Sequence, residues 1–383
     1  MNRRRFLGIV GTGFTVGAAG CLSDGGSPGT TPAGPTGTDP APTVTVEGDS
    51  TRVGSLADPD LPLSDSDLRR GAAKDAIPAI TDPVFGPDWS EESADLADDE
   101  RVIGVTAGDA ARAYPLAVLN WHEVVNDNFG GPLLVTFCPL CGSGVTAERR
   151  VDGQETVFGV SGLLWMSDLV MYDALTESLW SQVLGKAVKG PKTGTALALR
   201  PSTITTWGEW RGEHPETEVL LPPPKSATVK GEVSRDYDRD PYVGYDSSRR
   251  IGIGGDTADG RLHPKASVIG VATDEAARAY PLETVQDRGG VVNDTVGDLP
   301  VVVAATADGS LVAYERTVDG TTLTFARDGD VLTAGGSRWR IVSGRAQDGP
   351  HEGTTLTRAN DRSPMFWFAW ADFYPGTEIF GQG

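Results

Sequence analysis

The chain has 383 residues, and 53 Asp and Glu against 33 Lys and Arg give it a formal net charge of −20. So acidic a protein repels the phosphates of nucleic acids, which argues against a nucleic-acid partner. Its 3 cysteines exclude a disulfide-rich scaffold, and its 39% hydrophobic residues are enough to build a folded core.

The N-terminus predicts export. Arg3 and Arg4 precede an apolar stretch that is too short to span ~30 Å of hydrocarbon, so it indicates a signal peptide rather than a transmembrane helix. The two arginines resemble a twin-arginine export signal. Three small residues precede Cys21 and resemble a lipobox. We interpret residues 1–21 as a signal peptide with lipidation at Cys21; the alternative is a plain export signal with a chance cysteine.

Residues 22–74 predict a tether. They begin with a Gly-, Ser-, Thr- and Pro-rich stretch that has few apolar residues, and an acidic lead-in follows. A lipid on Cys21 would then hold the folded body at the outer face of the cell membrane, outside the cytoplasm. The acidic excess and the scarcity of lysine resemble halophilic proteins, in which surface carboxylates serve solvation.

The folded body contains an internal repeat. The sequence VIGVTAGDAARAYPL at 102–116 matches VIGVATDEAARAYPL at 268–282, and further matches follow in order, among them Trp210 with Trp370. A period of about 160 residues indicates a duplicated domain rather than a solenoid.

The matches predict two related halves, 75–221 and 266–383, joined by a polar connecting segment, 222–265. Many short apolar runs separated by turn residues predict a β-rich α+β fold in each half. The Asp-Gly pair at 152–153 predicts a hairpin turn. Residues 110–119 predict either one short helix or a helix and turn interrupted at Pro115.

The halves differ most in chemistry at a Cys-Pro-Leu-Cys-Gly motif that contains Cys138 and Cys141 and is missing from the second half. Such a motif is typical of a turn that presents two thiolates to a metal ion. His122 and His214 are the predicted further ligands, and an acid such as Glu123 could complete the set. The predicted cofactor is a transition metal: zinc, copper or iron.

Two alternatives remain for the cysteines. They could cycle between dithiol and disulfide with a redox partner, or they could form a static disulfide. In the static case the protein is a noncatalytic ligand-binding or assembly module. A small-molecule ligand would then bind an aromatic cleft lined by Trp121, Trp165, Trp180 and Trp207.

The segments NWHEVVND, FCPLCGSGV and FGVSGLLWMSDLVMYDALTESLWSQ carry a resemblance to a known family, together with TWGEW and HPETEVL. They resemble the exported bacterial and archaeal family labelled domain of unknown function 3179. The resemblance spans roughly residues 75–381. It implies export and the boundary of the folded body, and it implies no particular activity.

Overall fold

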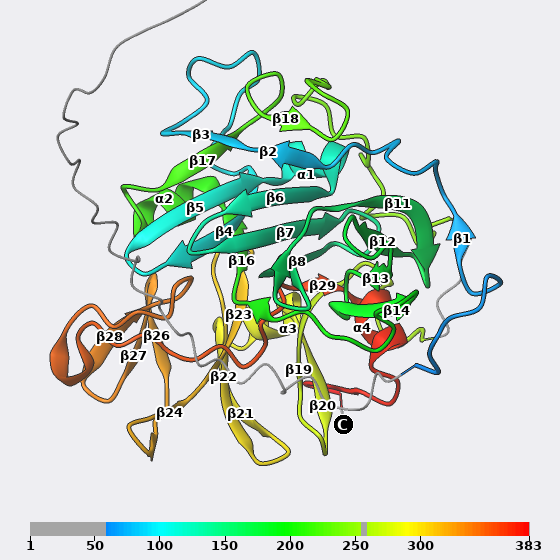
Figure 1. Ribbon diagram of the computed structural model, residues 1–383. Helices are drawn as coiled ribbons and strands as arrows, with labels where there is room; N and C mark the ends of the chain where they lie inside the picture. The colour runs from blue at the N-terminus through cyan, green and yellow to red at the C-terminus, as the bar shows by residue number, and fades with distance from the viewer. Residues whose placement is uncertain (1–58, 254–258, 383) are drawn as a thin grey trace, which may run out of the picture. The chain divides into compact units, whose positions relative to one another are not determined.

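The computed structural model describes residues 59–253 and 259–382, all of which belong to one compact unit of the chain (Figure 1). The predicted signal peptide, with Arg3, Arg4 and Cys21, lies outside the described residues, as does the start of the predicted tether. The described residues therefore comprise the folded body, which consists of the two predicted halves and the segment that joins them.

Strands make up 41% of the structure and helices 9%, which confirms the prediction of a β-rich fold. In the described residues the helices are α1 (Leu116–His122), α2 (Trp207–Glu213), α3 (Leu282–Asp287), α4 (Trp367–Phe373) and the 3-10 turn η2 (Gly349–His351). Such short helices form no layer of their own, so the α+β class is not confirmed. No helix in this part of the chain has the length and apolar character that a membrane span requires.

Within the described residues, three larger sheets and a hairpin are built mainly from the first half, with β1 added from the residues before it and β18 from the connecting segment. One sheet, in the order β16-β4-β5-β17-β3, is formed by Thr203–Thr206, Arg101–Ala107, Ala110–Pro115, Glu218–Leu221 and Val84–Gly86. The sheet β15-β8-β7-β6-β2-β18 is formed by Leu199–Arg200, Ser143–Glu148, Pro132–Cys138, Val124–Asn128, Ile80–Asp82 and Ala227–Thr228. The sheet β1-β11-β12-β13-β14 is formed by Arg69–Arg70, Phe158–Trp165, Asp168–Asp173, Leu179–Ser181 and Lys186–Lys189. The hairpin pairs β9 (Arg150–Val151) with β10 (Gln154–Glu155).

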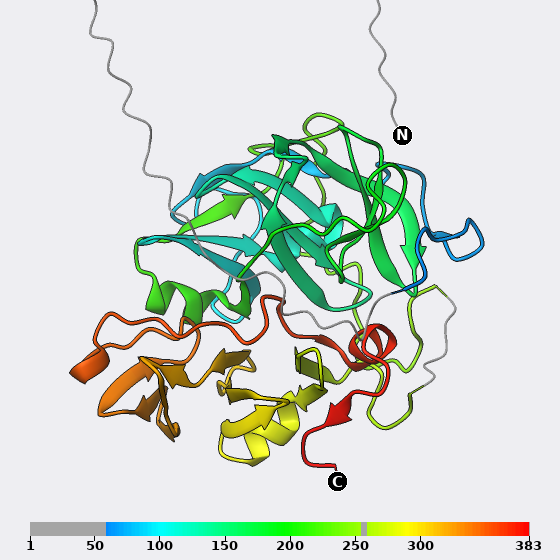
Figure 2. The ribbon, with the colours of Figure 1, turned by 60° about the horizontal axis from the view of Figure 1, so that its bottom comes forward.

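The second half has a similar set of smaller sheets, whose strands run from yellow to red on one side of the first half in Figure 2. The sheet β29-β19-β20-β30 is formed by Met365–Phe366, Ser267–Ala272, Ala277–Pro281 and Glu378–Ile379. The sheet β21-β22-β23 is formed by Val291–Val296, Leu299–Ala305 and Leu311–Glu315. The sheet β26-β27-β28 is formed by Ala326–Asp328, Val331–Ala334 and Ser337–Arg340, and a hairpin pairs β24 (Thr317–Val318) with β25 (Thr321–Thr322).

The two halves repeat the same contacts. Trp210 of α2 donates its indole N–H to Thr217 Oγ1 at 2.9 Å, and Trp370 of α4 donates to Thr377 Oγ1 at 2.9 Å. Both tryptophans are buried: Trp210 is 2% exposed and Trp370 is 1% exposed. The aligned tryptophans of the two halves therefore make the same hydrogen bond to a threonine seven residues further along the chain.

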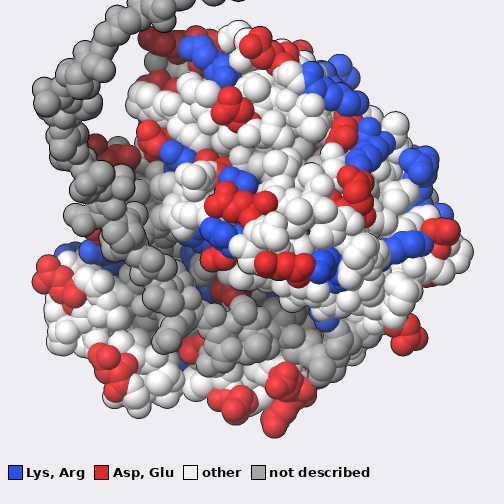
Figure 3. All heavy atoms as spheres, viewed as in Figure 1, with Lys and Arg blue, Asp and Glu red and all other residues white. Residues whose placement is uncertain are grey.

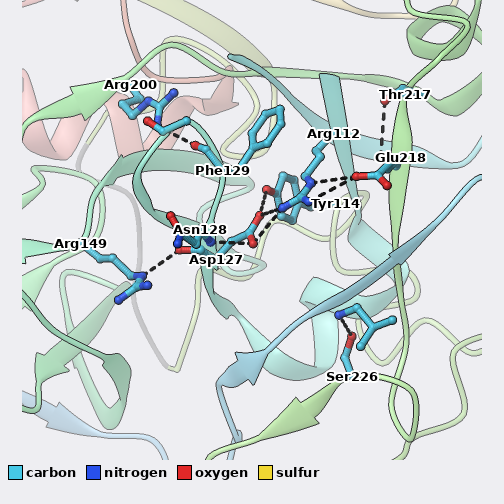
Figure 4. A network of polar contacts seen from close by, with 12 residues as sticks. Arg112, Tyr114, Asp127, Asn128, Phe129, Arg149, Arg200, Thr217, Glu218 and Ser226 are labelled. Atoms are coloured by element: carbon cyan, nitrogen blue, oxygen red, sulfur yellow. Dashed lines mark hydrogen bonds and ion pairs between the residues drawn. The ribbon is translucent and has the colours of Figure 1, made fainter. Parts of the chain in front are cut away.

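A buried ion pair is repeated in the same way. The Asp127 carboxylate accepts hydrogen bonds from Arg112 Nη1 at 2.9 and 3.0 Å and from Tyr114 Oη at 2.6 Å (Figure 4). Arg112 also pairs with Glu218 at 3.2 Å. The second half builds the same network from Arg278, Tyr280, Asp294 and Glu378. In the first half the network connects β5 and β6 to β17, which contains Glu218. In the second half it connects β20 and β21 to β30, which contains Glu378.

The two networks differ in burial, and this difference predicts unequal effects of mutation. The Asp127 side chain is 5% exposed and the Asp294 side chain 20% exposed. We expect Asp127→Asn to lower the free energy of unfolding by about 3 kcal/mol, because it removes the buried carboxylate that pairs with Arg112 and leaves only the exposed Glu218 to balance that charge. We expect Asp294→Asn to cost about 1 kcal/mol, because water solvates the remaining charge. Urea denaturation of both variants checks the ranking, and equal losses would contradict it.

Two local predictions can be compared with the structure. The predicted hairpin turn is confirmed, since Asp152 and Gly153 have φ values of 52° and 74° between β9 and β10. The predicted helix over 110–119 is wrong at its start, because Ala110–Pro115 forms β5 and the helix begins at Leu116. β5 pairs with β4 on one side and β17 on the other. This pairing outweighs the local helix propensity of the alanines.

The halves share a hydrophobic core. One buried cluster contains Cys138 and Cys141 of the first half together with Met365 and Trp370 of the second. The backbone N–H of Phe366 donates to the carbonyl oxygen of Cys141 at 2.8 Å. The second half therefore lies directly against the turn that carries the cysteines.

Acidic and basic side chains intermingle over the upper part of the face shown in Figure 3, and acidic side chains predominate along its lower edge. Several form exposed ion pairs, such as Lys74 with Glu177 at 2.6 Å and Arg211 with Asp98 at 2.5 Å. Exposed pairs of this kind contribute about 0–1 kcal/mol each. The fold therefore depends on its cores and sheets far more than on these charges.

Candidate metal site

The Cys-Pro-Leu-Cys-Gly motif forms the turn between β7 and β8, as predicted. Cys138 ends β7 and pairs with Ser143, the first residue of β8. Within the turn, the Cys141 N–H lies 3.1 Å from the Cys138 carbonyl oxygen and 3.4 Å from Cys138 Sγ. Gly142 has a φ of 61°, and a side chain there would meet the ring of Phe366 at 3.0 Å. Only glycine satisfies both the backbone and the packing at this position.

Both thiols are free, and Cys138 and Cys141 are 2% and 0% exposed. The structure therefore contains no Cys138–Cys141 disulfide. The two sulfur atoms lie 3.7 and 3.4 Å from the carbonyl oxygen of Ser167. Ser167 and Met166 form the tip of the β11–β12 hairpin, with positive φ values of 68° and 51°. This tip brings the start of β12 to the cysteines.

Asp168, the first residue of β12, is the third group of the site and is 0% exposed. Its carboxylate accepts a hydrogen bond from Ser181 Oγ at 2.5 Å and from the backbone N–H of Val183 at 3.2 Å. One carboxylate oxygen and the sulfur atoms of Cys138 and Cys141 all lie within 4.8 Å of one another. We call these three residues the Cys–Cys–Asp cluster. Among the described residues no other such group of His, Cys, Asp or Glu side chains could hold a metal ion.

The electrostatics of the Cys–Cys–Asp cluster favour a cation. Burial raises the pKa of the Asp168 carboxyl to about 7, although its hydrogen bonds act in the opposite direction. Burial also raises the pKa of the Cys141 thiol, with further contributions from Cys138 and from the charge of Asp168. Three groups that can each become anionic share a space withdrawn from water. Their charges repel unless protons or a metal ion neutralise them.

The donor atoms fit a transition-metal ion. Zinc binds thiolate sulfur at about 2.3 Å and carboxylate oxygen at about 2.0–2.2 Å, so ligands of one ion lie within about 4.6 Å of each other. The donor atoms of the cluster, all within 4.8 Å of one another, are close enough for one ion to draw them together. Ser181 and Val183 orient the carboxylate, as buried ligands require. Iron–sulfur clusters are usually held by four cysteines and copper(I) prefers soft donors, whereas zinc accepts both thiolates and carboxylates, so a mixed set of this kind favours zinc.

The two predicted histidine ligands lie elsewhere. In His122, Nδ1 donates to the carbonyl oxygen of Pro78 at 2.8 Å, and Nε2 accepts from Tyr237 Oη at 2.9 Å, in the tautomer that satisfies both contacts. His214 ends α2 and stacks on Trp210 at 4.2 Å, and its buried Nε2 has no hydrogen-bond partner. Burial lowers the pKa of each imidazole to about 4. Neither histidine belongs to the Cys–Cys–Asp cluster.

The four tryptophans predicted to line a cleft are divided between two cores. Trp165 and Trp180 are 8% and 0% exposed and lie in the core that contains the cysteines. Trp207 is 3% exposed and lies in a second core, against which Trp121 packs half-buried. These indoles fill cores, and the structure does not bring them together as a cleft.

Asp168 is the candidate ligand that was not predicted from the sequence, although comparison of the halves contains a signal for it. Trp180 and Trp339 occupy matching positions of β13 and β28, next to β12 and β27. Trp180 pairs with Met171, and Trp339 pairs with Leu332. Three residues before these partners lie Asp168 in the first half and Gly329, at the tip of a shorter hairpin, in the second. The carboxylate is therefore specific to the half that carries the cysteines.

The predicted family relationship is confirmed by comparison with known proteins. Residues 74–377 match the family described as protein of unknown function (DUF3179), and this range includes the whole Cys–Cys–Asp cluster. No curated protein and no solved structure is significantly similar to the chain. With a match that spans both halves and the segment between them, the chain belongs to the DUF3179 family.

Proposed function

We propose that this protein is a metal-binding protein in which the Cys–Cys–Asp cluster holds a transition-metal ion, zinc being the ion that its donors favour. One observation carries the proposal: two free thiols and a buried carboxylate converge within 4.8 Å of one another. A buried group of anions is costly without a compensating charge, and a divalent cation supplies that charge.

We infer that the protein works outside the cytoplasm, held at the outer face of the cell membrane by a lipid on Cys21. The support is in the sequence: Arg3 and Arg4, the short apolar stretch behind them, the small residues before Cys21 and the polar tether. A lipid chain and a tether would leave the folded body free to move above the membrane surface.

We further infer that the halves descend from an internal duplication and that only the first copy has the metal site. The repeated sequence and the repeated Trp210–Thr217 and Trp370–Thr377 contacts support a common origin. The second half would then act as scaffold for the first, because Phe366 closes one side of the cysteine turn.

Thiol–disulfide chemistry is the second candidate function, and the specific observation in its favour is a buried carboxyl beside two free thiols. Such chemistry requires one thiol that a partner can reach. Cys138 and Cys141 are 2% and 0% exposed, so burial favours a bound metal over exchange with another protein.

Elemental analysis of protein purified without chelators tests the proposal. We expect about one zinc ion per chain, with Cys138 and Cys141 unreactive towards a thiol reagent until the zinc is removed. Cys138→Ser and Asp168→Asn should each lower the zinc content at least about tenfold. Asp173→Asn is the matched control, because Asp173 is equally buried at the other end of β12 and bonds to Trp180 instead.

Two other results of these measurements would contradict metal binding. Metal-free protein whose thiols form a disulfide reversibly would replace metal binding with redox chemistry. Metal-free protein with inert thiols would contradict both functions and leave a structural role for the cysteine turn.

A further inference from the structure

We infer that Glu123 is the fourth ligand of the metal ion, an inference that rests on the metal function proposed for the Cys–Cys–Asp cluster. Closed zinc sites have four protein ligands in a tetrahedron, and the cluster supplies three. The backbone, the burial and the surroundings of Glu123 each point to this assignment.

Glu123 is held next to the cysteine turn by its backbone. It follows α1, and its N–H donates to the carbonyl oxygen of Leu119 at 2.8 Å. Its own carbonyl oxygen accepts the N–H of Phe137 at 2.8 Å, and Phe137 directly precedes Cys138. The α1–β6 corner and the end of β7 therefore hold Glu123 in a fixed position beside the first cysteine.

The conformation of Glu123 is one that glycine would adopt more easily. Its φ is 57°, in the left-handed region that disfavours residues with a Cβ. In the second half the corresponding residue is Gly290, with a φ of 79° and the same contact, from the N–H of Ala305 to its carbonyl at 3.0 Å. The metal-bearing half thus keeps a strained glutamate where its sibling has glycine, which indicates that the side chain has a function.

Glu123 is a buried acidic residue that has no polar partner for its side chain among the described residues. The residue is 7% exposed. Burial, with a smaller contribution from the charge of Asp168, raises the pKa of the Glu123 carboxyl to about 8. Glu123 and Cys138 also both act on the hydroxyl of Tyr242 and raise its pKa. Its carboxylate oxygens lie outside the 4.8 Å group, so ligation by Glu123 requires a change of side-chain rotamer when the metal binds.

The surroundings of the cluster favour a ligand from the protein over one from solvent. In the connecting segment, Tyr245 Oη donates to the carbonyl oxygen of Leu140, inside the cysteine turn, at 3.1 Å. The N–H of Gly252 donates to the same hydroxyl at 2.8 Å, and a side chain on Gly252 would lie 2.2 Å from Ser167 Oγ. The connecting segment therefore covers both the cysteine turn and the hairpin tip.

Cobalt(II) titration tests the inference, because cobalt replaces zinc and its visible absorption reports four-coordinate geometry. We expect Glu123→Gly and Glu123→Gln to weaken cobalt binding at least about tenfold and to reduce the visible absorption. Glu123→Gly should be no less stable than wild type without metal, since glycine suits this φ. Asp372→Asn is the matched control: Asp372 is a half-buried acid whose charge also acts on Cys141. We expect its cobalt affinity to stay within about twofold of wild type.

The outcomes separate this inference from the function on which it rests. If wild type binds cobalt through its thiols and Glu123→Gly binds it equally well, Glu123 is not a ligand and the metal function stands. If wild type binds neither cobalt nor zinc, both proposals fall. A loss in Asp372→Asn as large as that in Glu123→Gly would overturn the specific role of Glu123 and indicate a general effect of nearby charge.

Discussion

Gly104→Ala is expected to lower the free energy of unfolding by about 3 kcal/mol or more. A Cβ at position 104 would lie 2.3 Å from two carbon atoms of the Trp210 indole. The indole cannot move aside, because it is buried and donates to Thr217 Oγ1. The backbone cannot move either, because β4 pairs with β5 and β16. Urea denaturation followed by tryptophan fluorescence measures the loss.

The equivalent glycine of the second half, Gly270, allows the same experiment to be repeated, and Gly212 in α2 provides a control. Gly270→Ala should cost as much, since its Cβ would lie 2.2 Å from Trp370. Gly212 lies in α2 with open space around its Cβ position, so Gly212→Ala should stabilise the protein by up to about 1 kcal/mol. A Gly104→Ala protein within about 0.5 kcal/mol of wild type would show that the indole is not held as described.

Removal of bound zinc with a chelator is expected to lower the Tm by about 5 °C or more. An ion that binds only the folded state stabilises it by about 2.7 kcal/mol when its free concentration is 100 times its Kd. The effect should reach both halves, because the cluster joins the β7–β8 turn to β12, and Phe366 of the second half bonds to Cys141. Calorimetry before and after chelation measures the shift.

Two variants show whether the shift comes from the proposed site. Cys138→Ser should lose the response to the chelator, because the ion has lost a ligand. Asp294→Asn is destabilised in the second half, where its ion pair with Arg278 is broken, and should keep the full response. An equal Tm shift in Cys138→Ser would place the stabilising ion elsewhere in the molecule.

Local features were predictable because a few neighbouring residues determine them. Asp152 and Gly153 favour positive φ whatever surrounds them, and the predicted hairpin turn is present. The cysteine motif contains its own turn residues and likewise forms the predicted turn between two strands. The family relationship followed from long ordered motifs and is confirmed over residues 74–377.

Predictions that depended on distant partners were less successful. His122 was predicted as a metal ligand because it lies in the half that carries the cysteines, yet its two ring nitrogens bond to Pro78 and Tyr237. Residues 110–115 have helix-forming alanines, and pairing with β4 and β17 makes them a strand. In each case a partner far along the chain outweighed a local preference.

What the amino-acid sequence determined by itself was the β-rich character and the position of two cysteines in a tight turn, because each depends on local pattern. Only the tertiary structure decided which third group meets those sulfurs. Asp168 reaches Cys138 because the β11–β12 hairpin folds back over the β7–β8 turn and ends at Ser167, whose carbonyl both thiols contact. A metal site needs atoms within a few ångströms of one another, and chain folding, not sequence spacing, sets that distance.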